Sequence, residues 1–307
     1  MSRVAAIDVG TNSVRLLVAE PSAPGSTAPL SAVERLMRIT RLGAGVDATG
    51  RLDDAALART LDCIGDYAAR SAELGAVRMR ITATSAVRDA ADRDRFFEGV
   101  TERTGVTAQV LTGEQEARTA FRGAVTAVDG QAPYLVLDIG GGSTELIRGR
   151  SEPEAITSRQ LGCVRLTERC LRSDPPTASE IQDANDVVCD ELDEVERLID
   201  PRSAHTLIGV AGTITTLAAL HLRLDEYEPE KVHATRVLVE HVIDLTSRLA
   251  AMPVADRAAL GAMAPGREDV IVGGALILSR VMERFGFPEV LVSEADILDG
   301  LALSLLN

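Results

Sequence analysis

The chain has 307 residues, of which 46% are hydrophobic, so it holds enough apolar material for about two globular domains. Its formal charge of −14 is the opposite of what a nucleic-acid binder normally carries, so we expect no nucleic-acid partner. Lys231 is the only lysine, which excludes a P-loop nucleotide site and argues against covalent catalysis by a lysine.

The cysteines and the N-terminal residues favour a cytoplasmic protein. Four cysteines without a CxxC pair are typical of reduced residues and not of a structural zinc site. The first residues, MSRVAAIDVG, reach Asp8 before the apolar region of a signal peptide could form. The longest charge-free apolar stretch, 206–220, contains two glycines and is too short for a membrane span. We therefore expect a cytoplasmic protein without a membrane partner.

Two segments of the chain repeat one another. AIDVGTNSVRLLV, which starts at Ala6, aligns without gaps with VLDIGGGSTELIR, which starts at Val136. In each segment a β-rich run ends at an aspartate, Asp8 or Asp138, and a glycine-bearing turn and a second apolar run follow. This pattern is typical of a β-hairpin. Two similar hairpins predict two similar domains.

The remainder of the first half alternates between helical and strand patterns. The expected elements are a helix after Asp53, a strand over 77–83, a helix over about 92–103, a strand over 105–111 and a helix over about 113–125. Thr112 and Gln115 form a capping-box pair at the start of the last helix. The alternation predicts an α/β domain over residues 1–127.

The second half predicts another α/β domain, over residues 128–307. After its hairpin we expect a helix over about 178–198, a strand over 205–210, a glycine turn AGT that leads into an apolar helix, and a strand over 288–293. A final helix over about 296–306 closes the chain, and we expect it to pack back on the first domain.

The two repeated turns suit a particular chemistry. An acidic residue at a strand end, followed by small residues with exposed backbone N–H groups and a hydroxyl, can hold phosphate together with a divalent metal. DVGTNS and DIGGGS both have this composition. A turn that needs positive φ would also select each glycine, so either turn alone is a weak indication. Two such turns in register, one in each domain, are a stronger one.

Several segments resemble known families. Opposed phosphate loops on two duplicated domains are the arrangement of the actin, sugar-kinase and heat-shock-70 superfamily, and GVAGTITTL resembles its third glycine-rich motif. Within that superfamily, the chain resembles the exopolyphosphatase and guanosine pentaphosphate phosphohydrolase (Ppx/GppA) family. The matching segments are AIDVGTNSVRLLV, TATSAVRDA, TGEQEAR, DIGGGSTEL, LGCVRL, AGT and VSEADILDG.

The resemblance covers nearly the whole chain, from Ala6 to Gly300. It implies an α/β fold with two similar ribonuclease H-like (actin-like ATPase) domains around an inter-domain cleft. It further implies a phosphohydrolase activity that requires Mg2+, with Mn2+ as a possible substitute, and a homodimer.

The family likeness assigns the candidate catalytic residues. The family's catalytic glutamate falls on Glu116, which could accept a proton from the attacking water. From spacing alone, Glu116 could equally complement the dipole of its helix. Arg88, in TATSAVRDA, is the candidate that binds the transferring phosphoryl group. Gln115 departs from the family, which has a glutamate beside the catalytic one.

Metal and phosphate candidates come from the same segments. Asp138 and Glu145 are expected to hold magnesium, and Asp8 is a weaker, outer candidate; otherwise these residues would cap and orient their hairpins. The candidate phosphate-binding residues are Thr11, Asn12, Ser13, Gly140, Gly141, Gly142, Ser143, Gly212 and Thr213. Five arginines could form a local basic cleft in the acidic protein: Arg88, Arg118, Arg122, Arg165 and Arg267.

Together these features predict an exopolyphosphatase that releases terminal orthophosphate from inorganic polyphosphate by in-line attack of water. Longer family members carry further C-terminal helical domains, so we expect a preference for short chains. Hydrolysis of guanosine pentaphosphate to the tetraphosphate remains an alternative, although a chain with no Trp, three Tyr and five Phe offers few residues to stack on a base. A kinase, a filament protein and a non-catalytic nucleotide or polyphosphate sensor are further alternatives.

Overall fold

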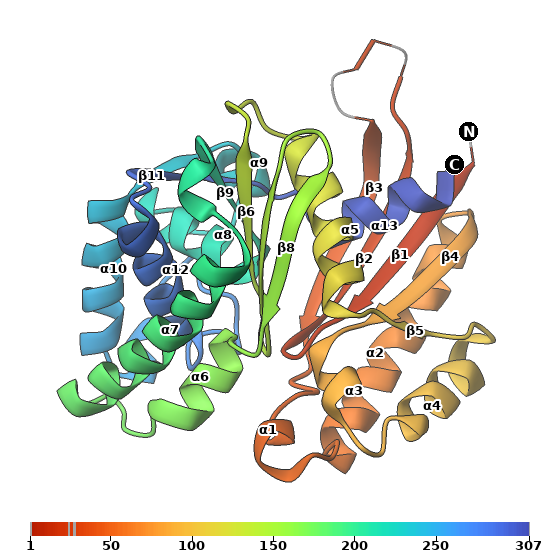
Figure 1. Ribbon diagram of the computed structural model, residues 1–307. Coiled ribbons are helices and arrows are strands. Elements are labelled where there is room, and N and C mark those ends of the chain that lie inside the picture. The colour runs from red at the N-terminus through yellow and green to blue at the C-terminus, as the bar shows by residue number, and fades with distance from the viewer. Residues whose placement is uncertain (1, 24, 27–28, 307) are drawn as a thin grey trace. The chain divides into compact units, whose positions relative to one another are not determined.

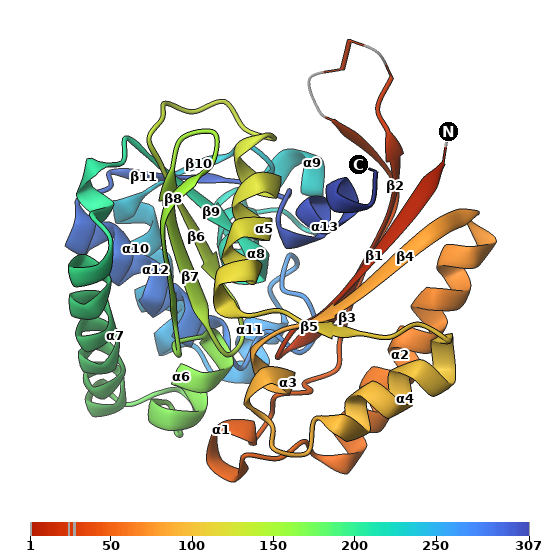
Figure 2. The ribbon, with the colours of Figure 1, turned by 45° about the vertical axis from the view of Figure 1, so that its right-hand side comes forward.

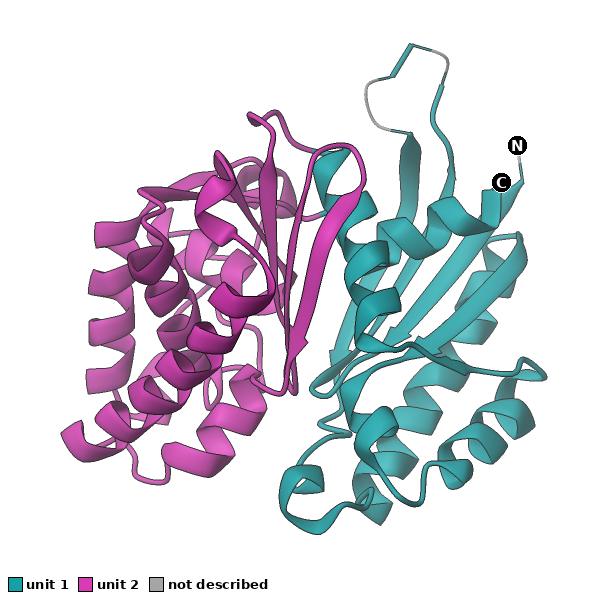
Figure 3. Ribbon diagram, viewed as in Figure 1, with its two compact units in different colours: residues 1–127, 295–307 teal, residues 128–294 magenta. Residues whose placement is uncertain are grey.

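The computed structural model describes residues 2–23, 25–26 and 29–306 of the chain. It divides into two compact units, one formed by residues 1–127 and 295–307 and the other by residues 128–294 (Figure 3). Each unit has its own sheet and its own apolar core. The chain therefore leaves the first unit after Ala127, builds the second, and returns at Ala295 to finish the first.

The sheet of the first unit has five strands in the order β3-β2-β1-β4-β5 (Figure 1). They are β1 (Arg3–Val9), β2 (Ser13–Pro21), β3 (Leu30–Ile39), β4 (Ala76–Ala83) and β5 (Gln109–Val110). β1, β2 and β3 pair antiparallel, whereas β4 and β5 extend the sheet in parallel. The strand predicted over 105–111 is much shorter than expected, because only Gln109 and Val110 pair with β4.

Helices provide the apolar partners of this sheet. They are α1 (Val46–Thr49), α2 (Asp54–Glu73), α3 (Ser85–Asp89), α4 (Asp94–Thr104), α5 (Gly113–Val125) and α13 (Ile297–Leu306). Alternate residues of β1 point to opposite faces and so join different cores. Ala5 and Ile7 belong to the core that contains residues of α2 and α4. Val4 and Ala6 belong to the core that contains Ala120 of α5 and residues of α13.

The last helix belongs to the first unit. Leu298 and Leu301 of α13 are buried in the same cluster as Leu17 of β2, and Figure 2 shows α13 beside β1 and β2. The second unit therefore ends at Glu294, before the limit of 307 expected for the second domain, because the apolar face of α13 is buried against the first sheet.

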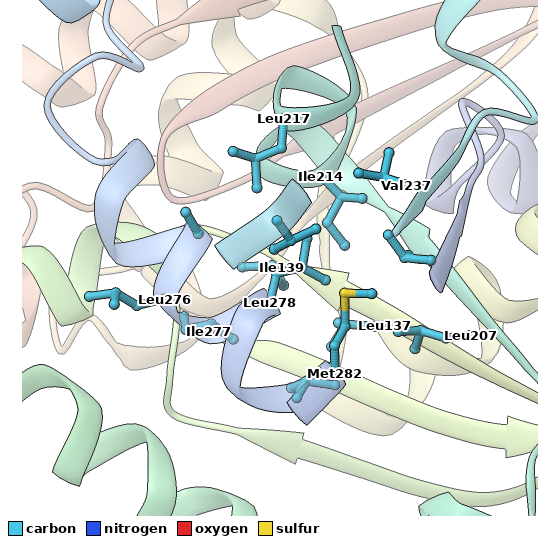
Figure 4. Packing of buried hydrophobic residues seen from close by; sticks show 14 of the residues in the cluster. Leu137, Ile139, Leu207, Ile214, Leu217, Val237, Leu276, Ile277, Leu278 and Met282 are labelled. Carbon is cyan, nitrogen blue, oxygen red and sulfur yellow. The ribbon is translucent and has the colours of Figure 1, made fainter. Parts of the chain in front are cut away.

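The second unit has a six-stranded sheet in the order β10-β11-β9-β6-β7-β8. Its strands are β6 (Tyr134–Ile139), β7 (Thr144–Gly149), β8 (Pro153–Arg159), β9 (Thr206–Val210), β10 (Arg236–Leu238) and β11 (Glu289–Val292). Its helices are α6 (Cys163–Cys170), α7 (Ala178–Leu198), the short 3-10 helix Pro201–Ser203, α8 (Ala211–His221), α9 (Pro229–Val232), α10 (Val239–Ala251), α11 (Val254–Ala258) and α12 (Ile271–Phe285). Residues of β6, α8 and α12 meet in its core, among them Leu137, Ile214 and Met282 (Figure 4).

The two units repeat one topology. β6, β7 and β8 form an antiparallel meander like β1, β2 and β3, and β9 and β11 extend it in parallel as β4 and β5 do. The two first turns close alike: Gly10 N donates to Ser13 O at 2.9 Å and Gly140 N to Ser143 O at 3.0 Å. The predicted hairpins and the α/β class with two similar domains are confirmed. β10 is an addition at the edge of the second sheet, antiparallel to β11.

The long helices are amphipathic. α2 and α7 bury one side and expose charged residues on the other. Within the described ranges, no helix combines the length and the apolar character needed to cross a membrane.

Candidate active site

The turn between β1 and β2 is held by backbone hydrogen bonds from the segment that follows β3. Thr40 N and Arg41 N donate to the carbonyl of Asn12 at 3.0 and 2.9 Å, and Gly43 N donates to the carbonyl of Thr11 at 2.8 Å. A Cβ at residue 43 would overlap the Thr11 side chain, so a glycine is required there. The turn thus has a fixed shape, in which Asn12 stays partly exposed.

α3 links this turn to the candidate catalytic pair. Ser85 Oγ lies 2.8 Å from Thr11 Oγ1, and Arg88 follows one turn later in the same short helix. Arg88 Nη1 lies 3.1 Å from Glu116 Oε2 and donates to Leu111 O at 2.9 Å. The structure therefore brings Arg88 and Glu116 together, although the sequence separates them by 28 positions.

Glu116 lies in the first turn of α5, and the cap of this helix decides which side chains remain available. The predicted capping box is confirmed: Gln115 N donates to Thr112 Oγ1 at 3.2 Å, and Thr112 N donates to Gln115 Oε1 at 2.9 Å. Glu114 is exposed and pairs with Arg118. Glu116 is only 8% exposed. Of the two acidic residues in this turn, Glu116 is therefore the one held inside the unit.

Asp8 lies near the end of β1, opposite Arg15 of β2. Arg15 Nη2 lies 2.8 Å from Asp8 Oδ2. Asp8 is buried, and this burial raises its pKa above the ordinary value, while the positive charge of Arg15 opposes the shift. The other carboxylate oxygen, Oδ1, is buried and accepts no hydrogen bond from the described residues. Asp8 thus has an ion-pair partner within its own hairpin.

The start of α6 holds the second turn, between β6 and β7. Cys163 N donates to Gly140 O at 3.0 Å, and Val164 N donates to Gly141 O at 2.9 Å. A Cβ at Gly162 would overlap the backbone of Gly141, so only glycine allows this approach. The LGCVRL segment therefore shapes the DIGGGS turn, which explains why both segments occur together in the family pattern.

Two arginines fix the glycine-rich backbone of the second unit. Arg165 Nε donates to Gly142 O at 2.7 Å. Arg267 Nη1 donates to Gly212 O at 2.7 Å and to Thr216 Oγ1 at 2.8 Å. These hydrogen bonds hold the carbonyls of Gly142 and Gly212, and so they fix the orientation of the peptide units in both candidate phosphate-binding segments.

The prediction of a glycine turn at AGT is wrong. β9 ends at Val210 and α8 begins at Ala211, so the Gly212 and Thr213 positions lie in the first turn of the helix. Ala211 has a φ of 69°, and this single left-handed residue makes the change of direction that we had assigned to glycine. Thr213 is buried, and Gly212 packs so closely on Arg267 that a Cβ would overlap the guanidinium.

Asp138 and Glu145 are a cross-strand pair on β6 and β7. They are 6% and 1% exposed, and Ser158 Oγ donates to Glu145 Oε1 at 2.7 Å. Two adjacent buried carboxylates fit a hard cation such as Mg2+, which commonly takes one or two protein carboxylates and keeps waters or phosphate oxygens as its other ligands. The described residues contain no cluster of three or more metal-ligating side chains.

The five arginines of the expected basic cleft have different surroundings. Arg88, Arg165 and Arg267 each contact a candidate catalytic residue or the backbone of a candidate loop. Arg118 forms an exposed pair on the surface of α5. The convergence of the five on one cleft stays a prediction.

Arg15 and Asp296 are not among the site residues predicted from the sequence. Both lie in segments of the family pattern, and Arg15 bridges Asp8 and Asp296. A signal for Arg15 was present: it aligns with Glu145 in the internal repeat, so the two hairpins carry opposite charges at one position.

Comparisons with known proteins agree on one family. Residues 18–307 match the Ppx/GppA phosphatase family. Exopolyphosphatase 2 of Mycobacterium tuberculosis is 45% identical over 315 residues, which cover 99% of each chain. A protein named guanosine-5'-triphosphate,3'-diphosphate pyrophosphatase, from Photobacterium profundum, is 32% identical over 219 residues, which cover 71% of this chain and 43% of that protein.

Solved structures match the fold of the whole chain. A crystal structure of an exopolyphosphatase-like protein is 37% identical, with a TM-score of 0.93 over 99% of this chain and 98% of that one. The Ppx/GppA family member of Aquifex aeolicus is 32% identical, with a TM-score of 0.83 over 99% of this chain and 98% of that one. The chain therefore belongs to the Ppx/GppA phosphatase family.

Proposed function

We propose that this protein is an exopolyphosphatase that releases terminal orthophosphate from inorganic polyphosphate. The observation that carries the proposal is the pair formed by Arg88 and the buried Glu116, 3.1 Å apart, in a unit whose rigid turn is rich in small polar residues. The 45% identity to exopolyphosphatase 2 over 99% of both chains supports polyphosphate as the substrate.

In this proposal Glu116 accepts the proton of the water that attacks the terminal phosphorus. General base catalysis of this kind contributes about 10²- to 10⁴-fold. The Arg88 contact holds the Glu116 carboxylate in place, and the remaining donors of the guanidinium bind equatorial oxygens of the phosphoryl group. Because the transition state of phosphoryl transfer is loose, most of the acceleration comes from such positioning and from charge stabilisation.

Backbone N–H groups and small hydroxyls would bind the phosphates of the chain. The turns are suited to this role because their shape is fixed by other segments and because most of their side chains are small. The residues proposed for this role are Thr11, Asn12, Ser13, Gly141, Gly142, Ser143, Gly212 and Thr213. Gly140, also predicted from the sequence, instead closes the turn, because its N–H donates to Ser143 O.

Asp138 and Glu145 would hold Mg2+, or Mn2+ in its place. A bound cation would neutralise negative charge on the phosphate oxygens. The pair fits a cation because both carboxylates are buried on adjacent strands. Asp8 fits less well, because its Oδ2 is already paired with Arg15. We therefore assign the metal to the second hairpin, with Asp8 as a residue that orients the first turn.

Guanosine pentaphosphate hydrolysis is the second candidate function. It is supported by the 32% identity to the Photobacterium profundum protein named guanosine-5'-triphosphate,3'-diphosphate pyrophosphatase. The same catalytic pair would act on the terminal phosphate of the nucleotide. Polyphosphate ranks first because the exopolyphosphatase relative is matched over its full length, whereas this match covers 43% of the nucleotide hydrolase.

The test compares phosphate release from polyphosphates of defined length, guanosine pentaphosphate and ATP, with and without Mg2+. Glu116→Gln should lower kcat by at least ~10²-fold while substrate still binds. Glu114→Gln is the matched control, because it changes the same chemical group in the same helical turn at an exposed position. It should retain kcat within about twofold.

Each outcome of this experiment is informative. Cleavage of guanosine pentaphosphate alone would replace the substrate and keep the catalytic residues. Binding of polyphosphate without phosphate release would favour a sensor. Equal losses in the two variants would remove Glu116 from its role as base. The homodimer, the cytoplasmic location and the preference for short chains stay predictions, and sedimentation and the substrate-length series test the first and the last.

A further inference from the structure

A chain of buried charges joins the first turn to the C-terminal segment. Arg15 of β2 contacts Asp8 through Nη2 at 2.8 Å and forms a second, shorter ion pair with Asp296 through Nη1. The side chains of Asp8 and Asp296 are 4% and 6% exposed, and that of Arg15 is 20% exposed. Ion pairs shielded from water in this way are screened little by salt and have a defined geometry. A shift of the Asp296 side chain would therefore be passed through Arg15 to Asp8.

Asp296 is itself fixed by the start of α13. Leu298 N donates to Asp296 Oδ1 at 3.0 Å, and Asp296 N donates to Asp299 Oδ2 at 3.0 Å. Asp299 in turn pairs with Arg35 of β3 at 2.7 Å. These contacts satisfy backbone groups at the helix start, so Asp296 cannot move without disturbing α13.

The same segment also packs on the helix that carries Glu116. A Cβ at Gly123 of α5 would overlap the carbonyl oxygen of Asp296, and a Cβ at Gly300 of α13 would overlap the carbonyl oxygen of Thr119. Glycine at both positions lets the backbones of α5 and α13 approach closely. The C-terminal segment thus contacts α5 on one side and the Asp8 hairpin on the other.

We propose that Asp296 is a positioning residue of the first unit. Through Arg15 it holds Asp8 and the Thr11–Ser13 turn at a set distance from α5, and so from Glu116. The backbone of Asp296 is held in place by its close contact with Gly123 and by its hydrogen bonds at the start of α13. This inference rests on the proposed phosphohydrolase function for its kinetic consequence, but its structural consequence can be measured without any substrate.

The experiment uses the full-length chain with Asp296→Asn. The matched control is Glu20→Gln, which removes a carboxylate from the same strand β2, where it pairs with Arg3, and leaves the contacts from Asp296 through Arg15 to Asp8 in place. Amide hydrogen exchange should become at least ~5-fold faster at Gly10 and Gly43 in Asp296→Asn and not at Gly140 of the other unit, because the first two amides close the first turn. Glu20→Gln should leave the exchange of Gly10 and Gly43 unchanged.

The kinetic arm measures phosphate release from polyphosphate. Misplacement of a reacting group by about 1 Å can cost ~10²-fold, so Asp296→Asn should lower kcat by ~10- to 100-fold with a smaller change in KM. Asp296→Glu retains the charge and should recover part of the lost rate. The control Glu20→Gln should keep kcat within about threefold.

The results separate this proposal from the proposed function. Unchanged exchange at Gly10 and Gly43 in Asp296→Asn would overturn the positioning role, whatever the activity. Exchange that rises equally throughout the first unit would also overturn it, since it would show a general loss of stability. Inactivity of the wild-type protein on every phosphate substrate would reject the proposed function and leave the exchange result as the test of Asp296.

Discussion

Asp8 and Asp138 occupy the same place in two repeated hairpins, but their cross-strand neighbours carry opposite charges. Asp8 is opposite Arg15, whereas Asp138 is opposite Glu145. An acidic residue beside an arginine forms an internal ion pair, and two acidic residues side by side attract a cation. A single substitution between the copies thus gives one hairpin a structural charge pair and leaves the other suited to a metal.

This difference predicts which carboxylates would hold Mg2+ in the proposed function. Glu145→Gln should weaken Mg2+ binding by at least ~10-fold, because it removes one of the two proposed protein ligands. Asp8→Asn should change the affinity by less than about twofold, because Asp8 is paired with Arg15 and is not one of the proposed ligands. Isothermal titration of the protein with Mg2+ measures both without substrate. Equal weakening by the two variants would contradict the assignment of the metal to the second hairpin.

At the scale of single residues, the sequence predicted which positions belong to the repeat and to the family segments, but not which side chains contact one another. The repeat and the family segments identified Asp8, Arg88 and Glu116, and the structure brings the last two together. Gly43 could not be predicted as a neighbour of Thr11, because no periodicity or cap indicates that the segment after β3 folds onto the first turn. Contacts of this kind depend on tertiary packing, which a local pattern does not contain.

Helices whose ends carry capping residues were the elements that the sequence predicted best. Thr112 caps α5 and Asp53 caps α2 through side-chain hydrogen bonds to the backbone. Both signals are local, because cap and helix lie within four residues of each other. β3 (Leu30–Ile39) was not predicted, because its residues are intermediate or exposed throughout and it lies at the edge of the sheet. Such a strand lacks the alternation that marks a half-buried strand.

Because α5 packs closely on α13, replacement of glycine by alanine should have opposite effects on stability at Gly123 of α5 and at Gly65 of α2. Gly123→Ala should destabilise the protein, because the new Cβ would overlap the carbonyl of Asp296. Gly65→Ala is the matched control, since its Cβ would approach only Arg103, at 3.9 Å, within the long helix α2. It should stabilise the protein by about 0.5–1 kcal/mol, the usual gain of Ala over Gly in a helix.

Denaturant unfolding of the two variants gives the comparison. We expect Gly123→Ala to lose about 1–3 kcal/mol, the range typical of an inserted methyl group in a packed interior. A gain of stability in both variants would show that α5 and α13 are not in tight contact.

The whole molecule consists of two similar units, of which the first is built from two separate segments of the chain and the second from one. The boundary after residue 127 followed from the position of the second hairpin, which is a feature of the sequence. The return of α13 to the first unit was expected from its position at the end of the chain, but its partners were not. An apolar helix face does not indicate which sheet it covers; only the structure places Leu298 and Leu301 with Leu17.

The position of α13 predicts how a shortened chain behaves. A protein of residues 1–294 lacks Ile297, Leu298 and Leu301, which are buried in the first unit. Burial of each such side chain is worth about 1.5–3 kcal/mol, a large share of the 5–15 kcal/mol that stabilises a typical domain. Amides of β1 and β2 should then exchange rapidly, while those of β6 and β9 remain protected. Protection that survives in both units would contradict this prediction.

Because the chain returns to the first unit at Ala295, the second unit is synthesised completely before the first unit is finished. A ribosome makes the strands of the first unit early, but the residues that complete its apolar core emerge only after the entire second unit has been made. Until then Val4, Ala6 and Leu17 lack their cover, and Arg15 lacks Asp296. The unit that contains Arg88 and Glu116 is therefore finished last, so nascent chains and prematurely terminated products would lack a complete first unit.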